Sequence, residues 1–307
     1  MPPLSSATML NRGLKLIGMS RAKRERWSDE SLVQSFIDHF GSAPRVLKKT
    51  FIALQDTNNE AAKVPAEHLN LKHFLMAMCF LTLHPKEKEI KVKWCCRQTF
   101  ENWVWCYISK VQALKEEKIV WPEHWSDPNN PFVPHFLFSV DGTHCAVFER
   151  QTTVMNRDEK YFSHKFSSAG VMYEVAIDVY HSRIVHIRGP FPAGRHDKAV
   201  FMEELMGKIP AGSKGIADNG YRSKEDMMEA YLAFPNSYAP RVLRKFLQRS
   251  RSRHESLYSR MKNFEVLNQR FRSKHADRDI RHKSCFEAIA VTLQFQMENG
   301  SPLMSVD

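Results

Sequence analysis

A change of pattern near residue 135 constrains the fold of this 307-residue chain more than any other feature. Before that point, apolar residues recur at helical spacing; after it, short runs rich in Val and Ile alternate with turn residues. The order in the second part is strand, strand, strand, helix, strand and helices. This order predicts an α/β architecture, a mixed sheet flanked by helices, with a small all-α domain in front of it.

The strands and helices of the second part can be assigned to residue ranges. Strand-like runs cover Phe136–Val140, Met172–Tyr180, Arg183–Arg188 and Lys214–Ala217, and Cys145–Phe148 continues extended after the first of them. His181-Ser182 separates two of these runs, which predicts an antiparallel hairpin. Helical patterns cover Asp197–Met206, the basic segment after Arg241, and Phe286–Met297.

The chain divides into four predicted segments. Residues 1–27 are expected to be a basic, disordered lead-in, and residues 28–120 a helical N-terminal domain with Ser28 as an N-cap and Gly41 as a helix end. A Pro-rich linker covers residues 121–134, and the α/β domain covers residues 135–300. The N-terminal helices fit either a DNA-reading helix-turn-helix or a plain helical bundle, and their spacing favours the bundle.

Positive charge is concentrated in one segment. The chain has a formal net charge of +11, and residues 241–283 contain 14 Lys and Arg against 4 Asp and Glu. Nearly all the excess therefore lies in that segment, and it predicts a polyanionic partner.

Cysteine usage and hydropathy indicate the compartment. The six cysteines have no spacing typical of zinc ligands, which predicts reduced thiols in an intracellular protein. The longest apolar run, residues 74–83, is shorter than the ~20 residues that cross a bilayer, so no membrane association is expected. Residues 21–26 are a short basic run that fits a nuclear address.

Three dispersed carboxylates are the candidate catalytic groups. Asp141 and Asp218 each follow a strand-like run and precede or lie close to a glycine, which fits an exposed acid at a sheet edge and fits a turn equally well. Glu255 stands among arginines, off the apolar stripe of its helix, where solvated ion pairs are the alternative. Three such acids are what metal-dependent phosphoryl transfer requires.

Other acids compete for this role. Asp178 lies inside an apolar strand and is a rival active-site acid. Asp197 begins a helix, where an N-cap is the favoured interpretation. His144 and His196 lie next to two of the acids, and a structural role is favoured for both.

Four motifs occur together in a fixed order. They are Ser139-Val-Asp141-Gly-Thr-His144, Gly194-Arg-His-Asp197-Lys-Ala-Val-Phe201, Ala217-Asp218-Asn-Gly-Tyr221 and Arg253-His-Glu255 with the following Met261-Lys-Asn-Phe264. With this set the chain resembles the DDE transposases of the PIF/Harbinger superfamily, from about Leu69 to Glu298. The resemblance implies an RNase H-like catalytic domain at residues 135–300 whose metal-binding acids are Asp141, Asp218 and Glu255, with Glu265 as the alternative to Glu255.

The resemblance also implies an activity and partners. The expected activity is cut-and-paste DNA cleavage and strand transfer in the nucleus, using two Mg²⁺ or Mn²⁺ ions held by the three acids. The basic residues near Glu255 would bind DNA phosphates; they are Arg249, Arg251, Arg253, Arg260 and Lys262. The expected substrates are terminal inverted repeats and a target site, and the protein partners considered are a separate Myb-like DNA-binding protein and a second copy of the chain.

Two other functions fit the same residues. One is a domesticated nuclear factor that binds DNA or protein without cutting. The other is a nuclease that acts on DNA or RNA without transposition. The presence of all three acids argues against the first of these alternatives.

Overall fold

The protein divides into two compact units, which are described separately. The computed structural model describes residues 4–86, 89, 97–125, 135–148, 158–222, 227–235, 238–272 and 277–306. The helical unit consists of Met1–Lys118, Met261–Gln269 and Ile280–Ser301, and the sheet unit of Ile119–Arg260, Arg270–Asp279 and Pro302–Asp307. Most of the predicted linker, residues 126–134, lies outside the described residues. The predicted segments 28–120 and 135–300 stay a prediction, while residues 261–269 and 280–301 group with the N-terminal helices.

The helical unit is a packed bundle. Its helices are α1 (Ser6–Leu16), α2 (Arg21–Arg26), α3 (Asp29–Phe40), α4 (Pro44–Asp56), α5 (Leu71–Leu83), α7 (Arg97–Ala113), α8 (Lys115–Lys118), α12 (Glu265–Asn268) and most of α13 (Arg278–Glu298). Helix α3 has the predicted ends, because the Ser28 side chain caps its start and Gly41 ends it with a φ of 75°. Helix α5 is buried from Phe74 to Thr82, as its all-round apolar pattern predicts.

The prediction of a disordered lead-in at residues 1–27 is wrong. Residues 6–16 and 21–26 are helical, and Met9 and Leu14 of α1 are buried. A side chain at Gly13 would collide with the ring of Phe36, so glycine lets α1 approach α3 closely. The apolar stripe of α1 was overlooked in the sequence because basic residues of its exposed side interrupt it.

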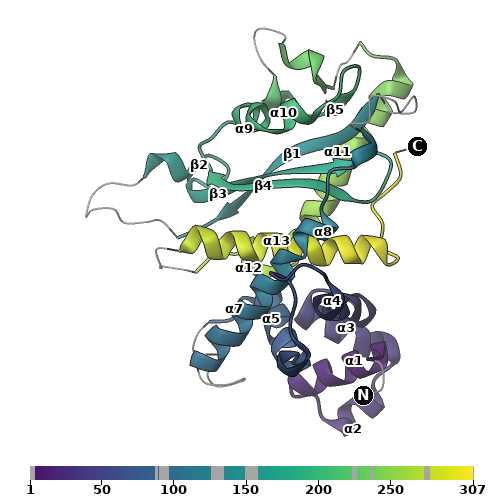
Figure 1. Ribbon diagram of the computed structural model, residues 1–307, viewed down its shortest axis with the longest axis vertical. Helices are drawn as coiled ribbons and strands as arrows, with labels where there is room; N and C mark the ends of the chain where they lie inside the picture. The colour runs from purple at the N-terminus through teal and green to yellow at the C-terminus, as the bar shows by residue number, and fades with distance from the viewer. Residues whose placement is uncertain are drawn as a thin grey trace. The chain divides into compact units, whose positions relative to one another are not determined.

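The sheet unit contains the predicted mixed sheet. Its strands are β1 (Phe136–Ala146), β2 (Phe162–Ser163), β3 (Ser168–Asp178), β4 (Ile184–Pro192), β5 (Lys214–Ile216) and β6 (Leu232–Ala233). Strands β1, β3 and β4 form an antiparallel meander, seen side by side in Figure 1, and β5 and β6 continue the sheet from β1 in parallel. With the flanking helices α9 (Asp197–Glu203), α10 (Leu205–Lys208) and α11 (Arg241–Lys262), this confirms the α/β fold class.

Strand β1 runs straight through the Asp141-Gly142 pair. Every residue from Phe138 to Ala146 has a partner on β3, and Asp141 is opposite Val175. The prediction that the strand ends at Val140 is therefore wrong, because β1 continues to Ala146. Pairing with β3 holds Asp141-Gly142 in an extended conformation, although this dipeptide favours a turn locally.

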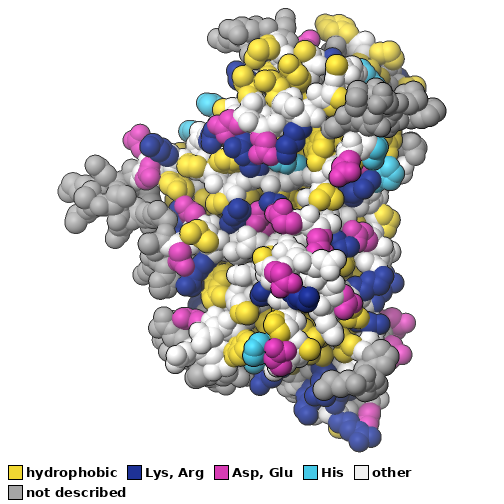
Figure 2. Space-filling view, in the orientation of Figure 1, with side chains coloured by type: hydrophobic (Ala, Val, Ile, Leu, Met, Phe, Trp, Pro, Cys, Tyr) yellow, Lys and Arg dark blue, Asp and Glu magenta, His cyan; other side chains and the backbone are white. Residues whose placement is uncertain are grey.

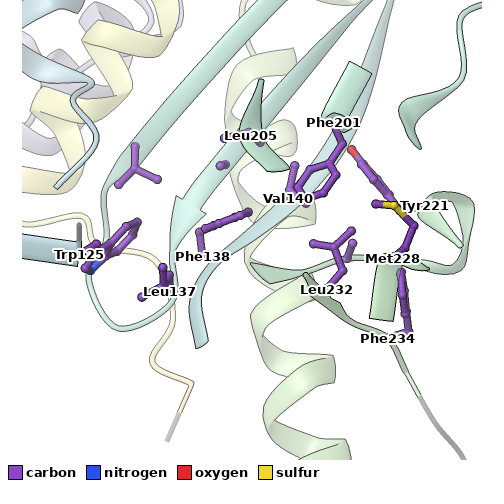
Figure 3. Packing of buried hydrophobic residues seen from close by; sticks show 13 residues of the cluster. Trp125, Leu137, Phe138, Val140, Phe201, Leu205, Tyr221, Met228, Leu232 and Phe234 are labelled. Carbon is purple, nitrogen blue, oxygen red and sulfur yellow. The ribbon is translucent and has the colours of Figure 1, made fainter. Parts of the chain in front are cut away.

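Apolar clusters pack helices onto both faces of the sheet. One cluster joins Phe138 and Val140 of β1 to Phe201 and Leu205 of α9 and α10; Figure 3 shows Phe201 against Tyr221 within it. A second cluster joins Leu247 of α11 to the sheet. Ile216 belongs to the second cluster and its neighbour Ala217 to the first. Since consecutive residues of an extended chain point to opposite sides, α9 and α11 cover opposite faces.

Within the described residues, no helix is long and apolar enough to cross a membrane. Cys79, Cys106, Cys145 and Cys285 form no disulfide, as predicted, while Cys95 and Cys96 lie outside the described residues.

A buried arginine fixes α11 to the turn between β3 and β4. The side chain of Arg253 is 2% exposed, and its guanidinium donates to the carbonyls of Val179 and His181, the latter at 2.6 Å. Burial lowers the pKa of this guanidinium, and nearby Asp178 opposes that shift. A buried carbonyl without a hydrogen-bond donor destabilises the folded state. Arg253 supplies donors to two such carbonyls, so its role is structural.

We therefore expect Arg253→Met to destabilise the protein by about 2–4 kcal/mol, because it keeps most of the side-chain volume but removes both donors. Urea unfolding followed by circular dichroism measures this change. The control is Arg249→Met on the exposed side of the same helix, with an expected effect below about 0.5 kcal/mol. Equal effects of the two substitutions would contradict the structural role of Arg253.

Candidate active site

The sheet has a notch where β5 ends. β5 pairs with β1 only as far as Ser139 and Ile216, while β1 continues to Ala146. Asp141 lies on β1 just beyond this pairing, and Asp218 follows β5 by two residues. The carboxyl end of a parallel strand is where α/β proteins place ligands, so this notch is the candidate active site.

Asp141 is held firmly by its surroundings. The Gly142 N–H donates to Asp141 Oδ1 at 2.9 Å, and the Tyr258 hydroxyl of α11 donates to the Asp141 carbonyl at 2.8 Å. Burial raises the pKa of Asp141 to about 7; Asp218 and Asp197 add to this rise, and Arg251 opposes it. Asp141 is therefore a desolvated carboxylate with two other acids beside it.

Asp218 occupies the turn after β5. Its Oδ1 accepts the Gly220 N–H at 2.8 Å and so caps the short 3₁₀ helix Asn219–Tyr221. This confirms the turn role that Asp218-Asn-Gly predicts, and the same geometry directs the carboxylate toward Asp141 and Asp197, whose pKa values it raises. The structural and the electrostatic roles are thus combined in one residue.

Asp197 also lies at the notch, contrary to the N-cap interpretation. The N-cap of α9 is His196, and no side chain caps this helix start. Burial raises the pKa of Asp197, Asp218 adds to the rise, and His196 and Lys165 oppose it. The His196-Asp197 pair within a motif was the sequence signal for a place at this site. The N-cap interpretation was favoured instead, because Asp is common at helix starts.

Glu174 was missed in the sequence. It is 1% exposed on β3, opposite Gly142, and neither of its oxygens accepts a hydrogen bond from a described residue. Burial raises its pKa to about 8, against the effect of Arg188. His186 Nε2 is 3.9 Å from its Oε2. An acid in the middle of an otherwise apolar strand was the signal, obscured by the nearby Asp178.

Glu255 is presented by α11, the helix that faces Asp141. Arg251, one turn earlier, acts electrostatically on Asp141, and Tyr258, about one turn later, bonds to it. Residues at i, i+4 and i+7 share one face of a helix, so Glu255 is on the face directed at β1. Its side chain is exposed.

The rival acids have structural partners. Asp178 is buried at the end of β3, where its Oδ1 accepts the N–H groups of Tyr180 and His181 at 2.9 and 3.0 Å. It is three residues along β3 from Val175, the partner of Asp141, or roughly 10 Å. Glu265 begins α12 in the helical unit and accepts a hydrogen bond from Gln269.

The predicted phosphate-binding residues separate into three groups. Arg249, Arg251 and Lys262 are exposed. Arg260 is half-buried and donates to the Pro302 carbonyl at 2.9 Å. Arg253 is buried as described above, so its assignment to DNA binding is wrong. On the face shown in Figure 2, basic and acidic side chains are interspersed, and no single basic patch covers it.

The donor chemistry at the notch suits a hard divalent cation. Carboxylate oxygens are the preferred ligands of Mg²⁺ and Mn²⁺, and Asp197 Oδ1 is a buried oxygen with no hydrogen-bond donor among the described residues. In the same part of the chain, no group of three or more His, Cys, Asp or Glu side chains is close enough to form a preassembled metal site.

The strand order and the acids at the end of β5 define an RNase H-like nuclease fold. Residues 140–293, half of the chain, match the family model described as DDE superfamily endonuclease. The chain belongs to this family. No curated protein and no solved structure matched the chain.

Membership of this family indicates a general type of activity. The family is one of nucleases and transposases that act on DNA, and its superfamily typically uses divalent metal ions. The matched residues include Asp141, Asp218 and Glu255 together with Glu174 and Asp197.

The buried acids predict an unusual dependence of stability on pH. A carboxyl whose pKa is raised on folding stabilises the fold fully below its unfolded pKa and loses that contribution as pH rises through the folded value. For Glu174 the window is from about pH 4.5 to about pH 8. The metal-free protein is therefore expected to lose stability across it, and Glu174→Gln to reduce the loss by about 2–4 kcal/mol.

Urea unfolding in the presence of a chelator, at several pH values between 4.5 and 8.5, measures this effect. Glu229→Gln, at an exposed carboxylate of the same unit, is the control and should leave the pH dependence unchanged. A Glu174→Gln protein with the wild-type pH profile would show that the Glu174 carboxyl is not desolvated.

Proposed function

We propose that this protein is a metal-dependent DNA endonuclease and strand-transfer enzyme of the cut-and-paste, PIF/Harbinger type. Its catalytic acids would be Asp141, Asp218 and Glu255. The observation that carries the proposal is the notch, where the charge of Asp218, just after β5, adds to the raised pKa of the buried Asp141 on the central strand. In support, Glu255 lies on α11 three residues before Tyr258, whose hydroxyl donates to the Asp141 carbonyl.

The positions of the acids suit phosphoryl transfer. Two divalent ions bound to such acids activate a water or a 3′-hydroxyl and stabilise the leaving oxygen. Asp141 is immobilised by pairing on β1 and by Tyr258, so it supplies a fixed reference point for the reacting phosphate. Its raised pKa means that, near neutral pH, the carboxyl must lose a proton to become a ligand.

DNA would be bound along the exposed side of α11. Arg249 and Arg251 are exposed there, and Lys262 is exposed at the end of the helix. Each phosphate neutralised by such a cation releases a counterion, which makes affinity strongly dependent on salt. The proposal further includes nuclear localisation, a Myb-like DNA-binding partner, and a second copy of the chain in the assembly.

The catalytic prediction concerns nicking of DNA that carries the element's own ends, in Mg²⁺ or Mn²⁺, with the Myb-like partner supplied. Asp141→Asn removes a charged ligand at nearly constant shape, so folding should survive while nicking falls at least about 10³-fold. Glu255→Gln should lose nicking similarly, with little change in stability because the side chain is exposed. A gel assay of supercoiled and linear substrate measures both.

Asp178→Asn serves as the matched control, since it makes the same chemical change at a buried acid of the same sheet. It should lower stability and preserve nicking by the folded fraction. Nicking that persists in Asp141→Asn would refute the assignment. A wild type that binds DNA without cutting would support the domesticated factor, and cutting without strand transfer would support a plain nuclease.

The DNA-binding prediction concerns charge on α11. The double substitution Arg249→Gln and Arg251→Gln should weaken DNA binding and reduce the slope of log affinity against log salt by about 2. Fluorescence anisotropy over a salt series measures the slope. Arg12→Gln with Lys15→Gln, two exposed cations of α1, removes the same charge elsewhere and should have little effect. Equal effects of the two pairs would show that net charge alone attracts DNA.

A further inference from the structure

Three aromatic rings lie together beside the first turns of α11, at the end of the sheet unit where β1 begins. The ring of Phe246 is 5.5 Å from that of Phe136 on β1 and 6.4 Å from that of Tyr180, measured between ring centroids. The N–H of Val179 donates to the Leu137 carbonyl at 3.1 Å, which brings the two flanking chain segments together. We call Phe136, Tyr180 and Phe246 the aromatic platform.

The core of the sheet unit covers only part of these rings. Tyr180 is 48% exposed, and Phe136 and Phe246 are half-buried against the apolar cluster of Leu247. Val242, about one turn before Phe246 on the same side of α11, is 81% exposed. Large apolar side chains that gather at one exposed place mark a binding surface.

The helix beside the aromatic platform carries positive charge and no negative charge. Residues 241–254 contain six Lys and Arg and no Asp or Glu. Lys245 and Arg249 are exposed, and each lies three residues after an apolar side chain of this surface, so both flank it. The nearby Asp178 is buried, and its carboxylate accepts N–H groups of the turn after β3. The surface therefore suits a polyanion that also presents flat apolar groups.

Single-stranded DNA has both properties. Its phosphates are negatively charged, and its unpaired bases offer flat faces that stack on aromatic side chains whatever the sequence. In a duplex these faces are covered by the neighbouring bases. An acidic peptide supplies charge without a planar ring at each charged unit. Charge and exposed rings together therefore favour an unpaired DNA strand.

The aromatic platform and the notch are connected by the same two elements. On β1, Phe136 is five residues before Asp141. On α11, Phe246 is nine residues before Glu255, roughly 13 Å along the helix. That length corresponds to about four nucleotides at the rise of one B-DNA strand. A strand end at the notch therefore needs only a few nucleotides to reach the platform.

We propose that the aromatic platform binds unpaired bases of a DNA strand whose end lies at the notch. Tyr180 and Phe246 would stack on the bases, while Lys245 and Arg249 contact the flanking phosphates. The inference rests on the proposed function, because it names the form of DNA that the enzyme holds beside its active site. It gives Tyr180 a contact to bases, in addition to the phosphate contacts of α11.

The test compares the binding of labelled oligothymidine with that of an abasic oligonucleotide of equal length, by fluorescence anisotropy with the full-length protein. The two probes have the same number of phosphates, so the ratio of their Kd values isolates the contribution of the bases. The wild type should bind oligothymidine about five- to a hundredfold more tightly. Tyr180→Leu should remove most of this preference, and Tyr180→Phe, which keeps the ring, should retain it.

Phe162→Leu is the matched control. Phe162 is also an exposed aromatic residue of the sheet unit, but it is paired with Ala169 at the other end of β3. Its substitution should leave the preference for oligothymidine unchanged. Phe246→Leu should act as Tyr180→Leu does, and circular dichroism verifies that this variant is folded, since its ring is half-buried.

A salt series separates stacking from charge. Tyr180→Leu should weaken the binding of oligothymidine by a similar factor at every salt concentration. The slope of log affinity against log salt should stay the same, because no phosphate contact is lost. A smaller slope with an unchanged preference for bases would mean that Tyr180 only positions the cations, and would overturn the inference.

Other outcomes decide between the inference and the proposed function. Equal Kd values of the wild type for the two probes would overturn the inference alone, because nicking by the acids at the notch does not require it. Tyr180-dependent binding of polyglutamate that is tighter than that of oligothymidine would overturn it in favour of an acidic protein. Dimerisation that Tyr180→Leu abolishes, without any effect on the preference for bases, would overturn it in favour of a second copy. If the wild type neither binds nor nicks DNA in any form, both fail.

Discussion

Repulsion between acids that are partly removed from water is the interaction on which the sheet unit depends. At the end of β5, burial raises the pKa values of Asp141 and Asp197, and the nearby charge of Asp218 adds to both rises; burial also raises the pKa of Glu174. Such a cluster opposes folding unless protons or cations neutralise it. The rest of the unit holds the cluster in place: β3 pairs along β1, ion pairs and Phe201 brace α9, and Arg253 fastens α11.

The acids arrive from three kinds of structural element, and each contributes a different property. A central strand gives Asp141 rigidity, and the turn after β5 gives Asp218 a backbone hydrogen bond that orients its carboxylate. Helix starts and helix faces, at Asp197 and Glu255, add acids from opposite sides of the sheet. At the notch, β1 extends beyond its pairing with β5.

The sequence was sufficient for the fold class, because strand patterns are local signals. Gly-flanked aspartates are local signals too, and they led to Asp141 and Asp218, whose catalytic role stays a prediction. It was insufficient where tertiary pairing overrides local preference. Asp-Gly at 141–142 favours a turn, and only the partner strand β3 keeps it extended. Arg253 reads as a surface cation because nothing in a basic helix marks the one arginine that points inward. Asp197 was interpreted as a helix cap for a similar reason. Gly142, whose backbone lies against the Asp197 carboxylate, is 55 positions away in the sequence.

The two attachments of α11 have a consequence for how the site can adapt. Arg253 ties the helix to the turn after β3, Tyr258 ties it to the carbonyl of Asp141, and Glu255 lies between these two residues. Sliding or rotating the helix would have to break both attachments at once. The backbone under Glu255 is therefore held on both sides, and movement of its carboxylate is left to the three side-chain torsions of this residue.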